Sequence, residues 1–372
     1  MRFDLNDDQE MLRQTARRFL EKEAPIATIR ERGGAPEGFT RAWWSAASEL
    51  GWTSLAVPEP LGGYILSGHA GQDLAVVVEE IGRGIGPGPF QPTAVCLDAL
   101  TRADAPREAL IADVLAGGAL VTWAFGEPGN TWRPPEFGAR AERDGSDWVL
   151  DGVKAYVEAG AQAELLLVTA RAADGLVQLL VPARTVGVTV IAGQSLDLVR
   201  RFAEVRFSQV RLPADAALTA APADAQVERQ LQLALLLQCA ETNGVVERAF
   251  EFTVEYMRGR HAFGRPIASY QALKHRLADM LVRIHSCMAT TDAALDAFDA
   301  GDPDAFRLSR IAKAYVATKS TAIMGDLVQM SGGIGVTWDY DLHIFERRVA
   351  VNRAVLGTPE LHRAAIHQLL VA

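Results

Sequence analysis

Two groups of residues in the last third of the chain could hold a phosphate-bearing ligand. Arg260 offers a planar fork of N–H donors that suits phosphate oxygens. Further along, Gln329 precedes Gly332, Gly333 and Gly335, and residues without side chains let a backbone approach a ligand closely. Taken singly, such an arginine is commonly a solvated charge, and a Gly-Gly-x-Gly run is commonly a helix end or a turn.

One glutamate is a candidate for acid–base chemistry. Glu241 lies in a segment of helical periodicity whose neighbours include Leu235, Leu236, Leu237 and Ala240. Because apolar surroundings disfavour an ionised carboxylate, we expect Glu241 to have a raised pKa, as a poised general base would. The alternative is a structural glutamate that bonds a facing polar group or lies at an interface.

The elements that must position these residues fall into three regions. The first 115 residues have helical periodicity, beginning at a capping box that Asn6 and Gln9 would form. Short β-rich runs separated by Gly, Asp and Pro then favour a small antiparallel barrel or sandwich. Helical periodicity returns from Gln226 onwards in long segments with short connections, which is typical of an antiparallel bundle. The predicted strands cover 119–125, 147–151, 165–169, 176–181, 186–191 and 205–210, and the predicted long helices cover 226–258, 270–300 and 304–330.

Composition excludes several classes of protein. The net charge of -9 argues against a nucleic-acid-binding protein, because phosphate contacts need an excess of Lys and Arg. No run of 18 apolar residues exists, so no membrane span is expected, and the polar N-terminus lacks a signal-peptide core. The scattered cysteines Cys96, Cys239 and Cys287 predict buried apolar residues rather than a metal site or disulfides, which fits a reducing cytoplasm.

Several motifs together resemble the acyl-CoA dehydrogenase family, and the resemblance runs over nearly the whole chain. They lie in residues 50–63, 79–83, 127–129, 150–154, 260–271 and 329–335. The resemblance implies an α+β chain with an N-terminal helical domain (1–117), a middle β-barrel or sandwich domain (118–215) and a C-terminal four-helix bundle (216–372). It also implies FAD as cofactor, α,β-dehydrogenation of an acyl-CoA thioester, and an electron-transfer flavoprotein as acceptor.

The resemblance assigns the cofactor-binding residues. In the family, the arginine of Arg-x-x-Phe-Gly reaches the FAD pyrophosphate of a neighbouring subunit, and the phenylalanine packs on the cofactor; here these are Arg260 and Phe263. The rest of the expected set is Tyr270, Gln271, Gln329, Gly332 and Gly333.

The chain departs from the family where the chemistry occurs. The family's catalytic glutamate stands at one of two positions, which here hold Ala234 and Leu356. Neither aliphatic side chain can accept a proton. The neighbours of the flavin ring also differ, because Gly126 replaces a threonine and Glu158 would bring an anion towards the ring. The usual Gly-Ser-Asp is replaced by residues 130–132.

These departures leave several hypotheses open. The chain resembles the base-lacking subunit of the heterotetrameric acyl-CoA dehydrogenases of actinobacterial steroid degradation, including residues 335–339, and would complete a partner's FAD site. It could instead be a self-sufficient homo-oligomer with Glu241 as a displaced base, a non-catalytic assembly subunit, or a relative that acts on carrier-protein thioesters. The apolar crowding of Leu231, Leu233 and residues 235–237 predicts that the chain is an obligate oligomer.

Overall fold

A computed structural model describes residues 5–219 and 222–371. Its N-terminal part is helical, and the predicted capping box is confirmed: Gln9 N donates to Asn6 Oδ1 at 2.8 Å and Asn6 N donates to Gln9 Oε1 at 3.3 Å. The helices are α1 (Asp7–Glu23), α2 (Ile26–Arg32), α3 (Arg41–Ser48), α4 (Ala70–Gly84), α5 (Phe90–Thr101) and α6 (Glu108–Leu115).

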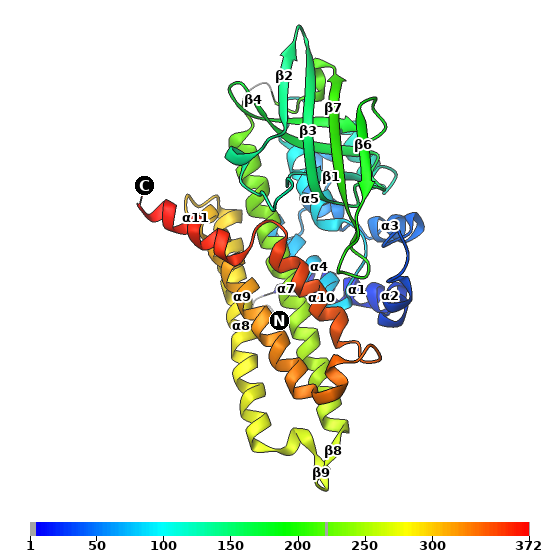
Figure 1. The fold of residues 1–372 in the computed structure, drawn as a ribbon, viewed down its shortest axis with the longest axis vertical. Helices are drawn as coiled ribbons and strands as arrows, with labels where there is room; N and C mark the ends of the chain where they lie inside the picture. The colour runs from blue at the N-terminus through cyan, green and yellow to red at the C-terminus, as the bar shows by residue number, and fades with distance from the viewer. Residues whose placement is uncertain (1–4, 220–221, 372) are drawn as a thin grey trace.

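The middle of the chain forms one curled seven-stranded sheet at the upper end of the molecule (Figure 1). The strand order is β1-β4-β2-β3-β7-β6, and β5 also pairs with β4. Most pairs of neighbouring strands are antiparallel, as expected. However, β1 and β2 each pair with β4 in parallel, which the β-rich runs of the sequence did not predict. The strands are β1 (Val121–Ala124), β2 (Arg140–Asp144), β3 (Asp147–Glu158), β4 (Leu165–Ala172), β5 (Gly175–Pro182), β6 (Val188–Ala192) and β7 (Phe202–Leu212).

The C-terminal part is a bundle of long helices below the sheet (Figure 1). The three predicted long helices are confirmed, with ends that agree within two residues. Between the first two lies a small hairpin at the lower tip of the molecule. These elements are α7 (Asp224–Gly259), β8 (His261–Ala262), β9 (Arg265–Pro266), α8 (Gln271–Ala300), α9 (Ala305–Ser331), α10 (Leu342–Ala354) and α11 (Pro359–Val371).

Two glycines let the N-terminal and C-terminal helices cross closely. A β-carbon on Gly82 of α4 would lie 2.1 Å from the carbonyl oxygen of Glu241, and one on Gly244 of α7 would lie 1.9 Å from that of Glu79. Real β-carbons do not approach so closely, so α4 and α7 need both glycines at this crossing. The contact fixes the middle of α7, which carries Ala234 and Glu241.

The leucines from Leu231 to Leu237 do not form an outer surface. Their crowding in the sequence is therefore not a valid reason to predict an oligomer. The chain buries each of them itself, with at most 5% exposed. The three cysteines are buried and free, as predicted. No helix in the described part of the chain is long and apolar enough to cross a membrane.

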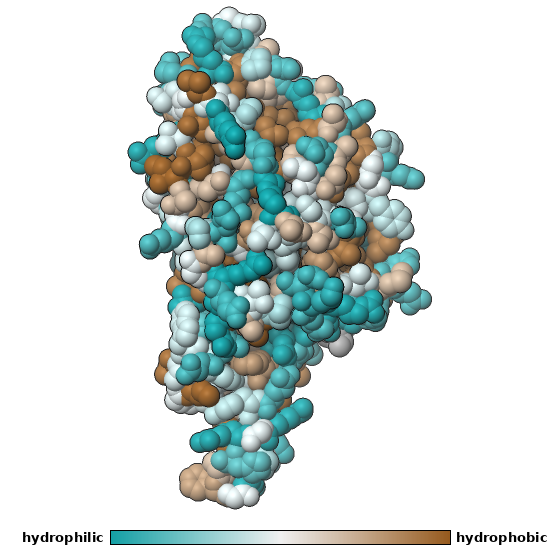
Figure 2. Space-filling model, turned by 90° about the vertical axis from the view of Figure 1, so that its right-hand side faces the viewer, coloured by the Kyte–Doolittle hydropathy of each residue, from teal (hydrophilic) through white to brown (hydrophobic). Residues whose placement is uncertain are grey.

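Other exposed hydrophobic side chains still predict an oligomer. Val282 of α8 is 65% exposed, and Val336 and Trp338, which follow α9, are 79% and 55% exposed. Hydrophobic residues also collect in separate clusters on the face shown in Figure 2. Because large exposed apolar side chains mark interaction surfaces, we expect sedimentation to give a species larger than the 40.2 kDa chain. A stable monomer at micromolar concentration would contradict this expectation.

Candidate active site and cofactor surface

A narrow crevice lies where the sheet meets α5, α7 and the segment after α10. Ala234 of α7 and Leu356 line it together, so the structure brings the two aliphatic substitutions to one place. Its free volume is only about 50 Å³. Leu356 has a φ of 62°, and this left-handed conformation costs a residue with a β-carbon roughly 1–2 kcal/mol. The surrounding packing must therefore impose it.

Aromatic side chains fill much of this crevice. Trp132 stacks on Tyr156 with ring centroids 5.3 Å apart, and Trp123 stacks on Phe125 at 4.2 Å. A β-carbon on Gly126 would lie 2.5 Å from the Trp132 ring, so Trp132 occupies its position only because residue 126 is glycine. The two departures from the family pattern at residues 126 and 132 are therefore coupled.

A buried ion pair holds the loop that carries Trp132. Lys154 Nζ donates to Glu127 Oε1 at 2.8 Å and to the Phe125 carbonyl at 3.0 Å. Glu127 also accepts from the backbone N–H groups of Gly138 and Ala139. Burial lowers the pKa of Lys154 to about 8 although Glu127 opposes the shift. The Glu-Pro-Gly segment at 127–129 thus stabilises the wall of the crevice.

Glu241 lies in a buried charge cluster, and the expectation of a raised pKa is wrong. Its oxygens accept from Arg348 Nη1 at 2.7 Å, from Asn352 Nδ2 at 2.8 Å and from Arg200 Nη1 at 3.1 Å. Burial would raise the pKa of Glu241, but Arg200 and Arg348, with the Asn352 hydrogen bond, outweigh burial and lower it. A carboxylate held in this way is a weak proton acceptor.

Arg200 also neutralises the anion that was expected to face a flavin. Glu158 of β3 accepts from Arg200 Nε at 2.9 Å and is paired with Arg200 Nη2. Burial raises the pKa of Glu158, and the nearby Arg200 only partly offsets that effect. Asp197 completes the cluster by pairing with Arg348. The cluster thus links β3, α7, α10 and the segment before β7.

The predicted cofactor residues lie elsewhere, at the lower end of the bundle. Arg260, Gly332 and Gly333 line one open hollow of about 470 Å³. Neither glycine has a neighbour within 4 Å of an added β-carbon, so the backbone is accessible. Phe263, at the tip of the β8–β9 hairpin, is 98% exposed.

The other predicted residues support this surface or lie exposed beside it. The Tyr270 hydroxyl donates to the Ala262 carbonyl at 2.9 Å, and the Arg265 guanidinium lies 3.9 Å from the Tyr270 ring centroid. Tyr270 therefore fixes the hairpin. Gln271 and Gln329 are exposed and do not line the hollow.

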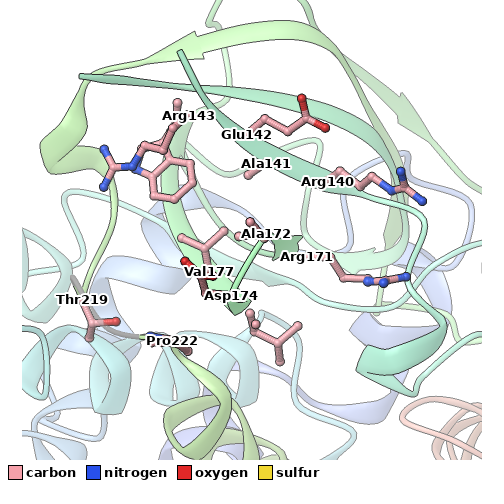
Figure 3. Close-up of a pocket in the computed structure, with 14 residues that line it drawn as sticks. Arg140, Ala141, Glu142, Arg143, Arg171, Ala172, Asp174, Val177, Thr219 and Pro222 are labelled. Carbon is pink, nitrogen blue, oxygen red and sulfur yellow. The ribbon is translucent and has the colours of Figure 1, made fainter. Parts of the chain in front are cut away.

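Another hollow, of about 700 Å³, lies at the outer end of the sheet (Figure 3). Arg140 and Arg171 extend to the same side there, while Arg143 points the other way, over Trp148. None of the residues predicted to bind cofactor or accept a proton lines it.

Comparison with known proteins identifies the family. Sequence models of the acyl-CoA dehydrogenase N-terminal and C-terminal domains match residues 6–116 and 224–371. The chain belongs to the acyl-CoA dehydrogenase family. Members are FAD flavoproteins that oxidise a CH–CH group.

Individual relatives match over nearly the whole chain. The acyl-CoA dehydrogenase IpdE2 of Mycobacterium tuberculosis is 29% identical over 355 residues, which cover 95% of this chain and 94% of IpdE2. Among solved structures, the Tcur3481–Tcur3483 steroid ACAD is 26% identical, with a TM-score of 0.88 and 98% of each chain covered. The ChsE4–ChsE5 complex of Mycobacterium tuberculosis, at 24% identity, covers 100% of this chain and 99% of its own, with a TM-score of 0.88, and shows the same fold.

The two regions fit FAD unequally. The open hollow at Arg260 has the cation and the bare backbone that a pyrophosphate needs. The crevice has too little room for a tricyclic flavin ring beside Trp132 and Tyr156. In Figure 1 the β8–β9 hairpin lies at the far end of the molecule from the sheet, so the two regions of one copy lie well apart.

The cations of the charge cluster, Arg200 and Arg348, were not among the predicted site residues. Arg348 follows Phe345 by three residues and Ile344 by four, so its position on the apolar face of α10 could have been inferred. No local pattern marks Arg200, which lies in the irregular segment before β7.

Proposed function

We propose that this chain is the base-lacking subunit of an FAD-dependent acyl-CoA dehydrogenase. It supplies Arg260, Phe263, Gly332 and Gly333 to an FAD site whose ring-binding half and catalytic glutamate belong to a second, related chain. The observation that supports this proposal most directly is the narrow crevice. Its two residues at the positions of the family's catalytic glutamate, Ala234 and Leu356, have no carboxylate.

The chemistry requires a base at the α-carbon and a flavin N5 at the β-carbon. Ala234 and Leu356 supply no base, and Glu241 is held by two arginines. Moving Glu241 towards a substrate would leave Arg200 and Arg348 short of a buried partner, which is strongly unfavourable. These contacts argue against Glu241 as a displaced base.

The exposed surface explains why the chain would still be required. Phe263 is almost fully exposed and an arginine and two glycines border an open hollow, so cofactor-directed side chains face outwards. A second chain docked against this surface would bury them around the adenosine diphosphate end of its own FAD. An FAD bound there would supply the hydride acceptor for the dehydrogenation.

The relatives support the class of substrate and the kind of assembly. A steroid ACAD with two named components matches this chain at 26% identity, and IpdE2 is an acyl-CoA dehydrogenase. We therefore propose an acyl-CoA substrate of steroid origin, a heterotetramer, and an electron-transfer flavoprotein as acceptor.

Arg260→Ala should weaken FAD retention while the fold stays intact. Loss of one charge-assisted contact to the pyrophosphate should cost roughly 1.5–3 kcal/mol, or about one to two decades in affinity. The measurement is flavin absorbance after gel filtration of the complex. Arg258→Ala is the matched control, because Arg258 is exposed on the last turn of α7 but does not line the hollow. Equal flavin content in both variants would remove Arg260 from the site.

A further inference from the structure

Trp132 is fixed at the crevice by contacts on more than one side. Its ring stacks on Tyr156 with an angle of 29° between the ring planes, and its Nε1 donates to Asn130 Oδ1 at 2.5 Å. The side chain is 4% exposed although it lies in the connection between β1 and β2 rather than in a strand or helix. A large ring that is held at its face and at its N–H has a defined position.

Gly126 provides the space that this indole needs. A β-carbon at residue 126 would lie 2.5 to 2.9 Å from three atoms of the six-membered ring of Trp132. Gly126 is not among the residues with a positive φ, so its backbone does not require glycine. The indole therefore requires glycine at this position, because no other neighbour comes as close.

Two residues that present the stacked rings have left-handed backbones. Asn130 has a φ of 62° and Tyr156 has a φ of 57°. Asparagine tolerates this conformation because its short side chain can bond locally, and here it accepts the indole N–H of Trp132. A tyrosine has no such compensation, so contacts around it must hold the strained backbone. The chain thus accepts local strain to keep the two rings stacked.

The stacked rings leave no room for a ring-shaped ligand beside them. Trp132 and Tyr156 both line the crevice, and the free volume that remains is about 50 Å³. An apolar cavity that takes up one benzene molecule measures about 150 Å³. A tricyclic ring therefore cannot enter unless one of these side chains moves or is removed.

We propose that Trp132, supported by Tyr156, is an intramolecular plug that fills the place of a flat aromatic ligand and so keeps a flavin ring out of this chain's crevice. The inference rests on the proposed function in one respect, namely that the chain holds no flavin ring of its own. It adds that one side chain causes the exclusion, so that a single substitution reverses it.

The experiment uses lumiflavin, which is the tricyclic flavin ring without the ribityl chain and the nucleotide. Because lumiflavin has no pyrophosphate, the surface at Arg260 offers its charge nothing to bind. Equilibrium dialysis against the purified full-length chain measures the binding. We expect half-saturation of Trp132→Ala at a lumiflavin concentration at least tenfold lower than that of the wild type. The matched control is Trp148→Ala, which removes a buried indole that does not line the crevice and should bind as the wild type does.

Gly126→Ala is an independent test, because it expels the plug without deleting it. The added β-carbon cannot coexist with the indole in its place, so Trp132 should move towards solvent. We expect the tryptophan emission of the chain to shift to longer wavelength and lumiflavin to bind as it does to Trp132→Ala. The matched control is Gly138→Ala in the same connection, where the nearest atom to an added β-carbon is 3.6 Å away and no shift is expected.

Two results would overturn the proposal. Equal lumiflavin binding by the wild type and Trp132→Ala would show that Trp132 does not close the crevice. Absence of binding in both Trp132→Ala and Gly126→Ala would show that Trp132 is ordinary packing. The proposed function is tested separately by the FAD content of the wild-type heteromer, so the two can fail independently.

Discussion

The purified chain should leave flavin oxidised with any acyl-CoA, and a glutamate-bearing acyl-CoA dehydrogenase subunit should restore bleaching. The expected increase in rate is about 10²–10⁴-fold, the usual contribution of a positioned general base. The reason is that Ala234 and Leu356 cannot accept the α-proton and that the adjacent crevice has no room for the ring. Anaerobic absorbance of the flavin band, with and without the partner, measures this.

Substitution of Glu241 distinguishes a base-lacking subunit from a self-sufficient enzyme. In the complex, Glu241→Gln should change the rate of bleaching little, because the carboxylate is bound by Arg200 and Arg348 rather than free. If Glu241 were the base, the chain alone would bleach its flavin and the glutamine variant would not. Rapid bleaching by the isolated chain that survives this substitution would contradict both accounts.

Arg348→Met should destabilise the fold by about 3–5 kcal/mol. Arg348 is fully buried and is paired with both Asp197 and Glu241, so its removal leaves two buried carboxylates short of a cation. Methionine nearly preserves the volume and so limits any cavity. Urea denaturation of the assembled protein at pH 7 measures the change in the free energy of unfolding.

The control for this prediction is the neighbouring arginine. Arg347 donates to the Leu196 carbonyl at 3.1 Å in an exposed position, so Arg347→Met should cost about 0.5–1 kcal/mol at most. Equal effects of the two substitutions would show that the cluster contributes little.

The pH dependence of the Arg348→Met effect has a definite sign. Burial acts to raise the pKa of Asp197 and of Glu241, but the arginines and the hydrogen bonds to each carboxylate outweigh burial and lower both values. A lowered folded pKa contributes stability above the unfolded value of about 4, and this contribution is lost as the pH falls through the folded value. The difference in the free energy of unfolding between wild type and Arg348→Met should therefore have its full value at pH 7. It should become smaller below about pH 4.

The fold was predictable where periodicity was strong and local. The long helices and six of the seven strands follow from apolar spacing and from turn residues. The exception is β2, Arg140–Asp144, where only Ala141 is buried and the remaining residues are exposed and charged, so no alternation of apolar residues marks it. The parallel pairing of β1 with β4 depends on the curl of the whole sheet.

The site was predictable only in part. The arginine and glycines of the cofactor surface lie in local motifs, and the structure brings Arg260, Gly332 and Gly333 to one hollow. The pKa of Glu241 was predicted in the wrong direction because its partners, Arg200 and Arg348, are remote in sequence. Apolar neighbours along one helix do not determine the pKa of a side chain that residues of other elements also contact.

The central claim is that this chain contributes half of an FAD site and cannot complete a second one in its own crevice. The most direct test is the flavin content of the assembled heteromer, measured by absorbance after denaturation and compared with the amount of each chain. The account predicts one FAD for each pair of unlike chains. One FAD for every chain, or a stoichiometric FAD complex of this chain alone, would contradict it.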